Sequence, residues 1–158
     1  MLEITIIELI LRAIPEAFLL ILGGCIISRK SIDNKSYLIA SMLFGVSTYL
    51  VRMLPIQFGV HTIIIIMIFI LINTSLNKIP IRKAISSSLI SIITLSICES
   101  INLFILNFLK IDVQAIIDNP LLKTLYFMPS LALFALIILI LYVVIRRKKK
   151  EGSKNVLN

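Results

Sequence analysis

Five long apolar segments decide what this chain can fold into. They cover residues 9–27, 37–54, 62–76, 84–109 and 124–145. A helix needs about 20 mostly apolar residues to cross the hydrocarbon core of a bilayer, so we read each segment as a transmembrane helix. Unbroken apolar runs at 63–66 and 136–141 argue against a lipid-embedded barrel, whose strands alternate apolar and polar residues. The predicted fold class is all-α, a polytopic membrane helix bundle over residues 1–147 with a basic tail at 148–158.

The composition agrees with this reading and excludes several other classes. Hydrophobic residues make up 59% of the 158 positions and charged residues 15%, against about 45–50% and about 25% in soluble domains. A soluble domain of this size has too small an interior to hide so much apolar surface. Five spans leave only short loops, so we expect no soluble catalytic domain and no enzyme.

Metal, disulfide and nucleic-acid functions are not expected either. One histidine and two cysteines at unrelated depths do not form a metal site, and both cysteines lie in apolar runs rather than in a disulfide framework. There is no phosphate-binding glycine loop, so we expect no cofactor. The pI of 9.8 does not indicate a nucleic-acid partner, because the basic residues sit where membrane proteins carry them.

Lysine and arginine predict the orientation. Three lie between the first and second spans, three between the third and fourth, and six after the fifth, which makes twelve of the 16 on one side. Cytoplasmic loops carry the excess of basic residues, so the N-terminus is predicted outside and the C-terminus inside a multi-pass cell-membrane protein. The N-terminal flank has no lysine, which agrees and argues against a cleaved signal peptide. The basic tail predicts contact with anionic membrane lipid, or alternatively docking of a cytoplasmic partner.

Ionisable residues at membrane depth mark the candidate site, because a buried charge needs a partner or a wet cavity. With the predicted topology, Glu16, Arg52, His61 and Glu99 all fall in the outer half of the membrane, and Arg12 lies one turn above Glu16. We predict an outward-facing polar pocket in which Arg52 pairs with Glu16 or Glu99. His61 is expected at its mouth, since histidine changes charge near physiological pH.

The alternative for the same residues is a structural ion pair that fixes helix packing and binds no ligand. Asn102, one turn beyond Glu99 on the fourth span, is added to the predicted ligand-binding set. Pro15 and Pro129 predict kinks in the first and fifth spans, which free backbone carbonyls beside these charges. Small residues predict close helix packing along the fourth span and at two glycines of the first: Ser87, Ser91, Thr94, Cys98, Gly23 and Gly24.

Several short strings in these regions carry a resemblance. They are RAIPEAFL at 12–19, YLVRMLP at 49–55, FGVHT at 58–62, CESIN at 98–102 and FMPS at 127–130. The chain resembles small multi-spanning membrane proteins of clostridia, and its layout is similar to the membrane-embedded input regions of Firmicutes sensor histidine kinases, including those that detect quorum-sensing peptides. The resemblance implies sensing of an extracellular signal and output on the cytoplasmic side. The sequence after Arg147 has no dimerisation helix, phosphoacceptor histidine or ATP-binding domain, so a partner is expected to carry the output.

Three functions follow from these observations. The first is a stand-alone signal-sensing or regulatory membrane module, possible as a homodimer, in which an unknown extracellular ligand acts through a cytoplasmic or membrane partner. The second is a substrate-binding or carrier subunit of a membrane transporter, which predicts a deep polar pocket. The third is a structural or immunity-type membrane protein, in which mutation of a charged pair changes stability and nothing else.

Overall fold

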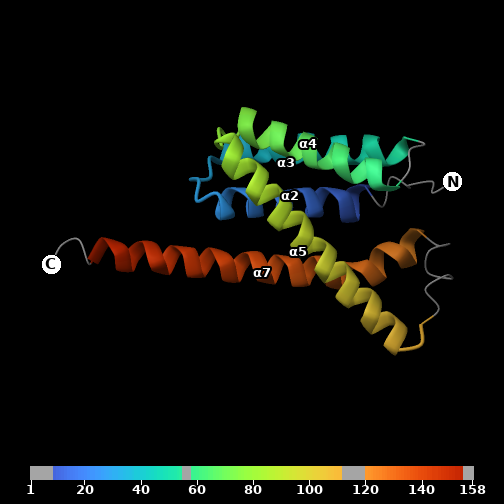
Figure 1. The fold of residues 1–158 in the computed structure, drawn as a ribbon. Helices are drawn as coiled ribbons and strands as arrows, with labels where there is room; N and C mark the ends of the chain where they lie inside the picture. Colours follow the sequence, from blue (N-terminus) through green and yellow to red (C-terminus); the bar gives the residue numbers. More distant parts are fainter. Residues whose placement is uncertain (1–8, 55–57, 112–119, 155–158) are drawn as a thin grey trace.

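The chain is a bundle of helices, as expected. The computed structural model describes residues 9–54, 58–111 and 120–154, and these contain no strand (Figure 1). Glu8, which lies two turns before Glu16 on the same predicted helix face, and residues 55–57 are outside the described residues. The elements in chain order are η1 (Leu9–Ala13), α2 (Ile14–Ile27), α3 (Asn34–Met53), α4 (Phe58–Ser75), α5 (Ile81–Phe108) and α7 (Pro120–Lys154).

Helix α2 lies at the centre of the bundle. It packs against α3, α4, α5 and α7, and eight of its 14 residues are buried. In Figure 1, α2, α3 and α4 run side by side, α7 lies along the opposite side of α2, and α5 crosses the others diagonally. The core around α2 includes Leu20, Ile21, Phe44 and Phe69, and the rings of Phe44 and Phe69 meet edge to face at 5.3 Å. A helix that is apolar on all sides is expected in such a central position.

The helix ends are set by local capping residues and prolines, which a hydropathy pattern does not show. Helix α3 begins at Asn34, three residues before the predicted span, because the Asp33 carboxylate accepts hydrogen bonds from the Ser36 backbone N–H and hydroxyl. These bonds lower the pKa of Asp33. Helix α5 likewise begins early, at Ile81, directly after Pro80.

The first predicted span is divided in two. Residues Leu9–Ala13 form the π-helix η1, and the α-helix begins at Ile14 with Pro15 in its first turn. The predicted interruption beside Pro15 therefore takes the form of a change of helix type. At the other proline, α7 continues through Pro129 and bends in its N-terminal part (Figure 1), as expected where a backbone donor is missing.

Two helices end in a left-handed residue that is not glycine. At the end of α2, Arg29 has φ 54° and its N–H bonds to the Ile26 carbonyl. Lys110 has φ 53° at the end of α5 and bonds to the Asn107 carbonyl. In both places the next residue bonds five positions back, which completes a Schellman motif. This position usually belongs to glycine, so both cations occupy it at a cost of about 1 kcal/mol.

The predicted packing of small residues is present. Ser87, Ser91 and Cys98 are buried on α5, while Thr94 is only half-buried. A Cβ added at Gly24 would lie 2.9 Å from Cζ of Phe69, and one at Gly23 would lie 3.2 Å from Cδ1 of Ile138. Both glycines therefore allow neighbouring helices to approach α2 closely.

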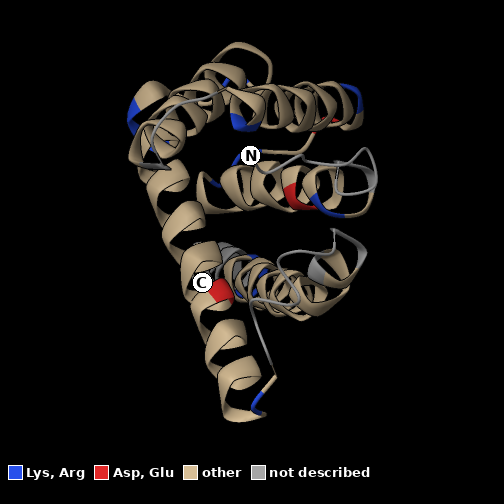
Figure 2. Cartoon of the chain, turned by 90° about the vertical axis from the view of Figure 1, so that its right-hand side faces the viewer, with Lys and Arg blue, Asp and Glu red and all other residues tan. Residues whose placement is uncertain are grey.

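The outside of the bundle is apolar, which fits a bilayer rather than water. Large hydrophobic side chains are exposed along α3, α4, α5 and α7, with Phe104 73% and Phe108 80% accessible. Three segments are long and apolar enough to cross a membrane, namely Asn34–Met53, Ile81–Phe108 and Thr124–Arg147. Figure 2 views the bundle from the end where η1 begins, and the helices are uncharged over most of their length. These features are those of a membrane protein.

Candidate functional site

A buried carboxylate forms the centre of the candidate site. Glu16 is 5% exposed although it is ionisable. Its Oε1 accepts a hydrogen bond from Nη2 of Arg52 at 3.2 Å, so the predicted pairing of Arg52 with Glu16 is confirmed. Its Oε2 is buried without a hydrogen bond and lies 3.9 Å from Nε of Arg12. The carboxylate therefore joins α3 to α2, and one of its oxygens accepts no hydrogen bond.

Arg12 extends the cluster to two further helices. Its Nη2 donates to Oε1 of Glu99 on α5 at 2.6 Å. Its guanidinium also lies over the ring of Phe127 on α7, 4.7 Å from the centroid, a distance at which a cation is attracted to the face of the ring. We call Arg12, Glu16, Arg52 and Glu99 the charge network. With Phe127 it links η1, α2, α3, α5 and α7 at one end of the bundle.

The positions of these residues along their helices explain why they meet. Arg12 and Glu16 are one turn apart, which places them on the same face of the first span. Glu16 lies in the first turn of α2 and Arg52 in the last turn of α3, where the helix dipoles favour a negative and a positive charge respectively. Antiparallel packing of α2 on α3 brings these two turns together.

The network is balanced in charge and graded in exposure. It contains two cations and two carboxylates, so its formal charge is zero. The Glu16 side chain is 7% exposed and that of Arg12 17%, whereas those of Arg52 and Glu99 are each 33% exposed. Two members are therefore accessible at the edge of a network whose centre is shielded, and a ligand could reach those members without unfolding the bundle.

The two other predicted site residues lie apart from the network. Nε2 of His61 is 3.1 Å from the backbone oxygen of Leu54, so the histidine joins the start of α4 to the end of α3. Asn102 is buried, and its Nδ2 donates to the Tyr126 carbonyl at 2.9 Å. The carbonyl that loses its helical donor to Pro129 is that of Leu125, so this bond lies beside the proline site and joins α5 to α7. Neither residue contacts the four charged side chains through a bond that the structure records.

Sequence reasoning missed Phe127, although it placed the string 127–130 among the notable segments. Aromatic residues are common in membrane helices, and only the arrangement of α7 beside η1 shows that this ring faces a guanidinium. The partner of Arg12 was also missed. The sequence placed Glu99 two to three turns below the outer surface, and the diagonal course of α5 is what brings it to Arg12.

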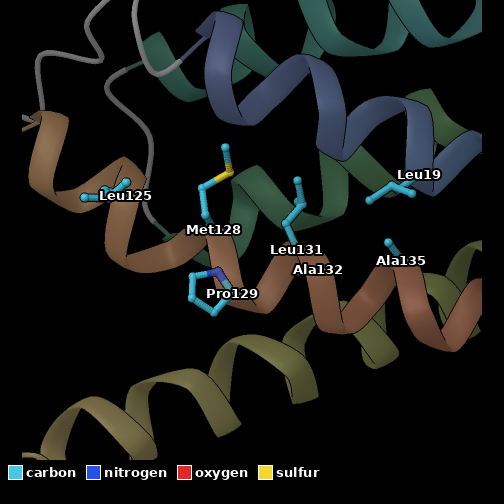
Figure 3. Close-up of a pocket in the computed structure, with 7 residues that line it drawn as sticks. All are labelled: Leu19, Leu125, Met128, Pro129, Leu131, Ala132 and Ala135. Carbon is cyan, nitrogen blue, oxygen red and sulfur yellow. The ribbon is translucent and has the colours of Figure 1, made fainter.

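Two cavities are lined by residues outside the charge network. The first is an open groove of about 430 Å³ between α2 and α7 (Figure 3), and its lining is apolar: Leu19, Leu125, Met128, Pro129, Leu131, Ala132 and Ala135. Two of these residues, Leu125 and Met128, lie within two positions of Phe127 in sequence, although Phe127 itself does not line the groove. The second cavity, also about 430 Å³, lies between the end of α2 and the start of α5.

Comparison with known proteins found no match: no family model, curated protein or solved structure matches the chain. Within the described part of the chain, no three His, Cys, Asp or Glu side chains are grouped so that they could hold a metal ion. What the site can do is therefore argued from its own residues.

Proposed function

We propose that the protein is a multi-pass cell-membrane sensing module in which the charge network is the element that an external ligand alters. The observation that carries the proposal is the position of Arg12. This one guanidinium contacts Glu99 at 2.6 Å, lies 3.9 Å from Glu16, and covers Phe127. A change in its pairing would therefore change how α2, α5 and α7 are held together.

The proposed topology has five spans, with the N-terminus outside and the C-terminus inside. Besides the three long apolar helices, α4 has the 17-residue apolar segment Gly59–Ser75, and η1 and α2 contribute five and 14 consecutive residues. Nineteen helical residues extend about 28 Å, close to the roughly 30 Å of a bilayer core. The connections at 28–33 and 76–80 lie at the same end of the bundle as the end of α7 (Figure 1), which supports the sorting of basic residues to one side.

The network offers two ways of pairing. In the present one Arg12 binds Glu99, and Oε2 of Glu16 has no hydrogen bond. In the second, a ligand cation neutralises the accessible Glu99, and Arg12 moves from its 3.9 Å ion pair with Oε2 of Glu16 to hydrogen-bonding distance of that oxygen. A buried carboxylate oxygen without a hydrogen bond is costly, so the second pairing gains at Glu16 part of what it loses at Glu99. Such near balance is what a two-state switch requires.

A peptide or a small amphiphile suits this site best. The apolar groove of Figure 3 runs along α7 from Leu125 to Ala135. A ligand with a positive group at Glu99 can place an apolar segment in this groove, where burial of its hydrocarbon supplies affinity. The response would pass along α5 and α7 to the basic inner ends, where a cytoplasmic or membrane partner, or a second copy of the chain, would receive it.

The test neutralises Glu99 and follows the opposite end of the bundle. Spin labels are placed at Ile81 and Arg147, the inner ends of α5 and α7, with both native cysteines replaced by serine. The full chain is reconstituted in lipid nanodiscs, and the label-to-label distance is measured by pulsed electron resonance. Glu99→Gln is expected to shift the distance by about 2 Å, the size of the helix shifts that carry switching.

Ser100→Ala provides the matched control. Ser100 is the next residue of α5, is exposed, and bonds only within its own helix to the Ser96 carbonyl. Its variant should keep the wild-type distance. If Glu99→Gln lowers the stability but leaves the distance unchanged, the network is not a switch, and the sensing proposal fails.

A structural or immunity-type protein is the second candidate, and the charge balance of the network favours it. Two cations and two carboxylates satisfy one another without a ligand, and such pairs can serve packing alone. The carrier alternative predicts a deep polar pocket, and neither described cavity is lined by any residue of the network. No observation therefore favours transport.

A further inference from the structure

The second cavity is lined by residues that have no part in the sensing proposal. It lies where α2 ends and α5 begins, and five of its six lining residues are of polar or basic type: Ser28, Arg29, Arg82, Lys83 and Ser86, with Ile27 as the sixth. Its volume of about 430 Å³ falls within the range of about 300–1,000 Å³ typical of small-molecule sites. The charge network is at the other end of the bundle, so the two features are independent.

Within the part of the chain that the structure describes, no carboxylate pairs with the cations of this cavity. Arg29, Arg82 and Lys83 are exposed, and none of them forms an ion pair within the described residues. Asp33 is the described carboxylate nearest in sequence, and its Oδ2 is engaged by Ser36. Three basic side chains that converge on one cavity without an acidic neighbour favour an anion there.

Backbone donors add to this preference. The cap residue of α5 is Pro80, and it supplies no side-chain hydrogen bond to the first turn. The N–H groups of Ile81 and Arg82 have no partner inside the helix, whereas that of Lys83 bonds to the Pro80 carbonyl at 2.9 Å. Free N–H groups at a helix start, together with the helix dipole, attract anions such as phosphate. Arg82 and Lys83 belong to this same turn.

A buried hydroxyl gives the independent indication of a ligand. Ser28 is 5% exposed, lines the cavity, and its Oγ has no hydrogen-bond partner. Among the other buried serines of the described chain, Ser41, Ser87, Ser88 and Ser130 donate to a backbone carbonyl of their own helix, whereas Ser91, which does not line the cavity, has no partner either. Buried polar groups are nearly always hydrogen-bonded, so an unpartnered one calls for an explanation. A phosphate oxygen at the cavity would provide its partner.

We infer that this cavity binds the phosphate of an anionic phospholipid headgroup, held by Ser28, Arg29, Arg82 and Lys83. The surroundings favour a lipid over a soluble anion. Ile81 and Ile85 are exposed on the same turns of α5, so a headgroup in the cavity leaves its acyl chains against apolar helix surface. Basic pockets between membrane helices at the cytoplasmic side are known to hold anionic headgroups, and this end carries the predicted cytoplasmic charge.

The experiment measures lipid retention by native mass spectrometry. The full chain is purified in a neutral detergent with equal amounts of phosphatidylglycerol and phosphatidylcholine. Wild type is expected to retain one phosphatidylglycerol with roughly tenfold preference. The variant R82Q/K83Q should lose this preference, and Ser28→Ala should weaken it several-fold, the effect of one hydrogen bond to a charged group.

The control removes the same charge at the same end. R146Q/R147Q alters two exposed arginines of α7 that do not line the cavity and should keep the preference. Equal loss in both double variants would mean general surface attraction and would overturn the inference. Displacement of the lipid by inorganic phosphate as readily as by added phosphatidylglycerol would identify a soluble phosphate instead. Lack of any preference in wild type would also refute the site. None of these outcomes depends on the charge network.

Discussion

The pair of Arg52 and Glu16 allows the sharpest prediction about stability. Two unit charges 3.2 Å apart attract by about 1.3 kcal/mol at the permittivity of water and by about 5 kcal/mol at an effective permittivity of 20. The Arg52 side chain is 33% exposed and that of Glu16 is 7% exposed, so the environment lies between these limits. We expect a coupling energy of about 2 kcal/mol between the two side chains.

The assay is a double-mutant cycle. Arg52→Gln, Glu16→Gln and the double variant are unfolded from neutral micelles by a titrated denaturing detergent, and the free energy of unfolding is compared with wild type. Arg52→Gln should lose about 3 kcal/mol because it leaves the buried Glu16 carboxylate without its hydrogen bond, and Glu16→Gln should lose less, about 2 kcal/mol, because the Arg52 side chain that it leaves is 33% exposed. The double variant should lose about 2 kcal/mol less than the singles predict together.

A second cycle serves as the control. Arg52→Gln combined with Ser100→Ala joins two positions that share no contact in the structure, so their effects should add. A coupling below about 0.5 kcal/mol for Arg52 and Glu16, equal to that of the control, would refute the reasoning that this pair joins α3 to α2.

Three further substitutions test the packing and the helix ends by the same unfolding measurement. Gly24→Ala should destabilise by about 1–3 kcal/mol, because its Cβ would lie 2.9 Å from the buried ring of Phe69. The control is Gly59→Ala, whose Cβ would meet nothing within 4 Å and which should not destabilise. An equal loss of stability in both variants would contradict the packing argument. Lys110→Gly should stabilise by about 1 kcal/mol, because φ is 53°; a loss of stability would mean that the lysine side chain has a role. Asn102→Leu should destabilise by about 1 kcal/mol through loss of its hydrogen bond to α7, and an unchanged value would show that the bond contributes nothing.

The sequence was sufficient for the fold class and for the meeting of three charged residues. Apolar runs of membrane length required helices, and alternating passage through a bilayer placed Glu16, Arg52 and Glu99 at the same end. The sequence left the partner of Arg52 open between Glu16 and Glu99, and the structure shows that it is Glu16. These inferences rest on length and direction, which the order of residues contains.

Other features depend on geometry that the order of residues does not contain. The crossing of α5 over the bundle brings Glu99 to Arg12, and a one-dimensional depth estimate cannot include such a tilt. His61 bonds to the Leu54 carbonyl instead of joining the network, since the start of α4 lies against the end of α3. From the sequence, the only prediction for Arg29, Arg82 and Lys83 was that their loops are cytoplasmic. The cavity that they share depends on the packing of α2 against α5.

The orientation of the bundle underlies both proposals, and accessibility to a membrane-impermeant reagent tests it most directly. In a background without native cysteines, Lys30→Cys lies in the connection after α2 and Lys110→Cys at the end of α5, and both positions are exposed. The account predicts that a charged maleimide added to intact cells labels the cysteine at 110, and that the one at 30 reacts only after permeabilisation. Labelling of position 30 in intact cells, with position 110 protected, would contradict it.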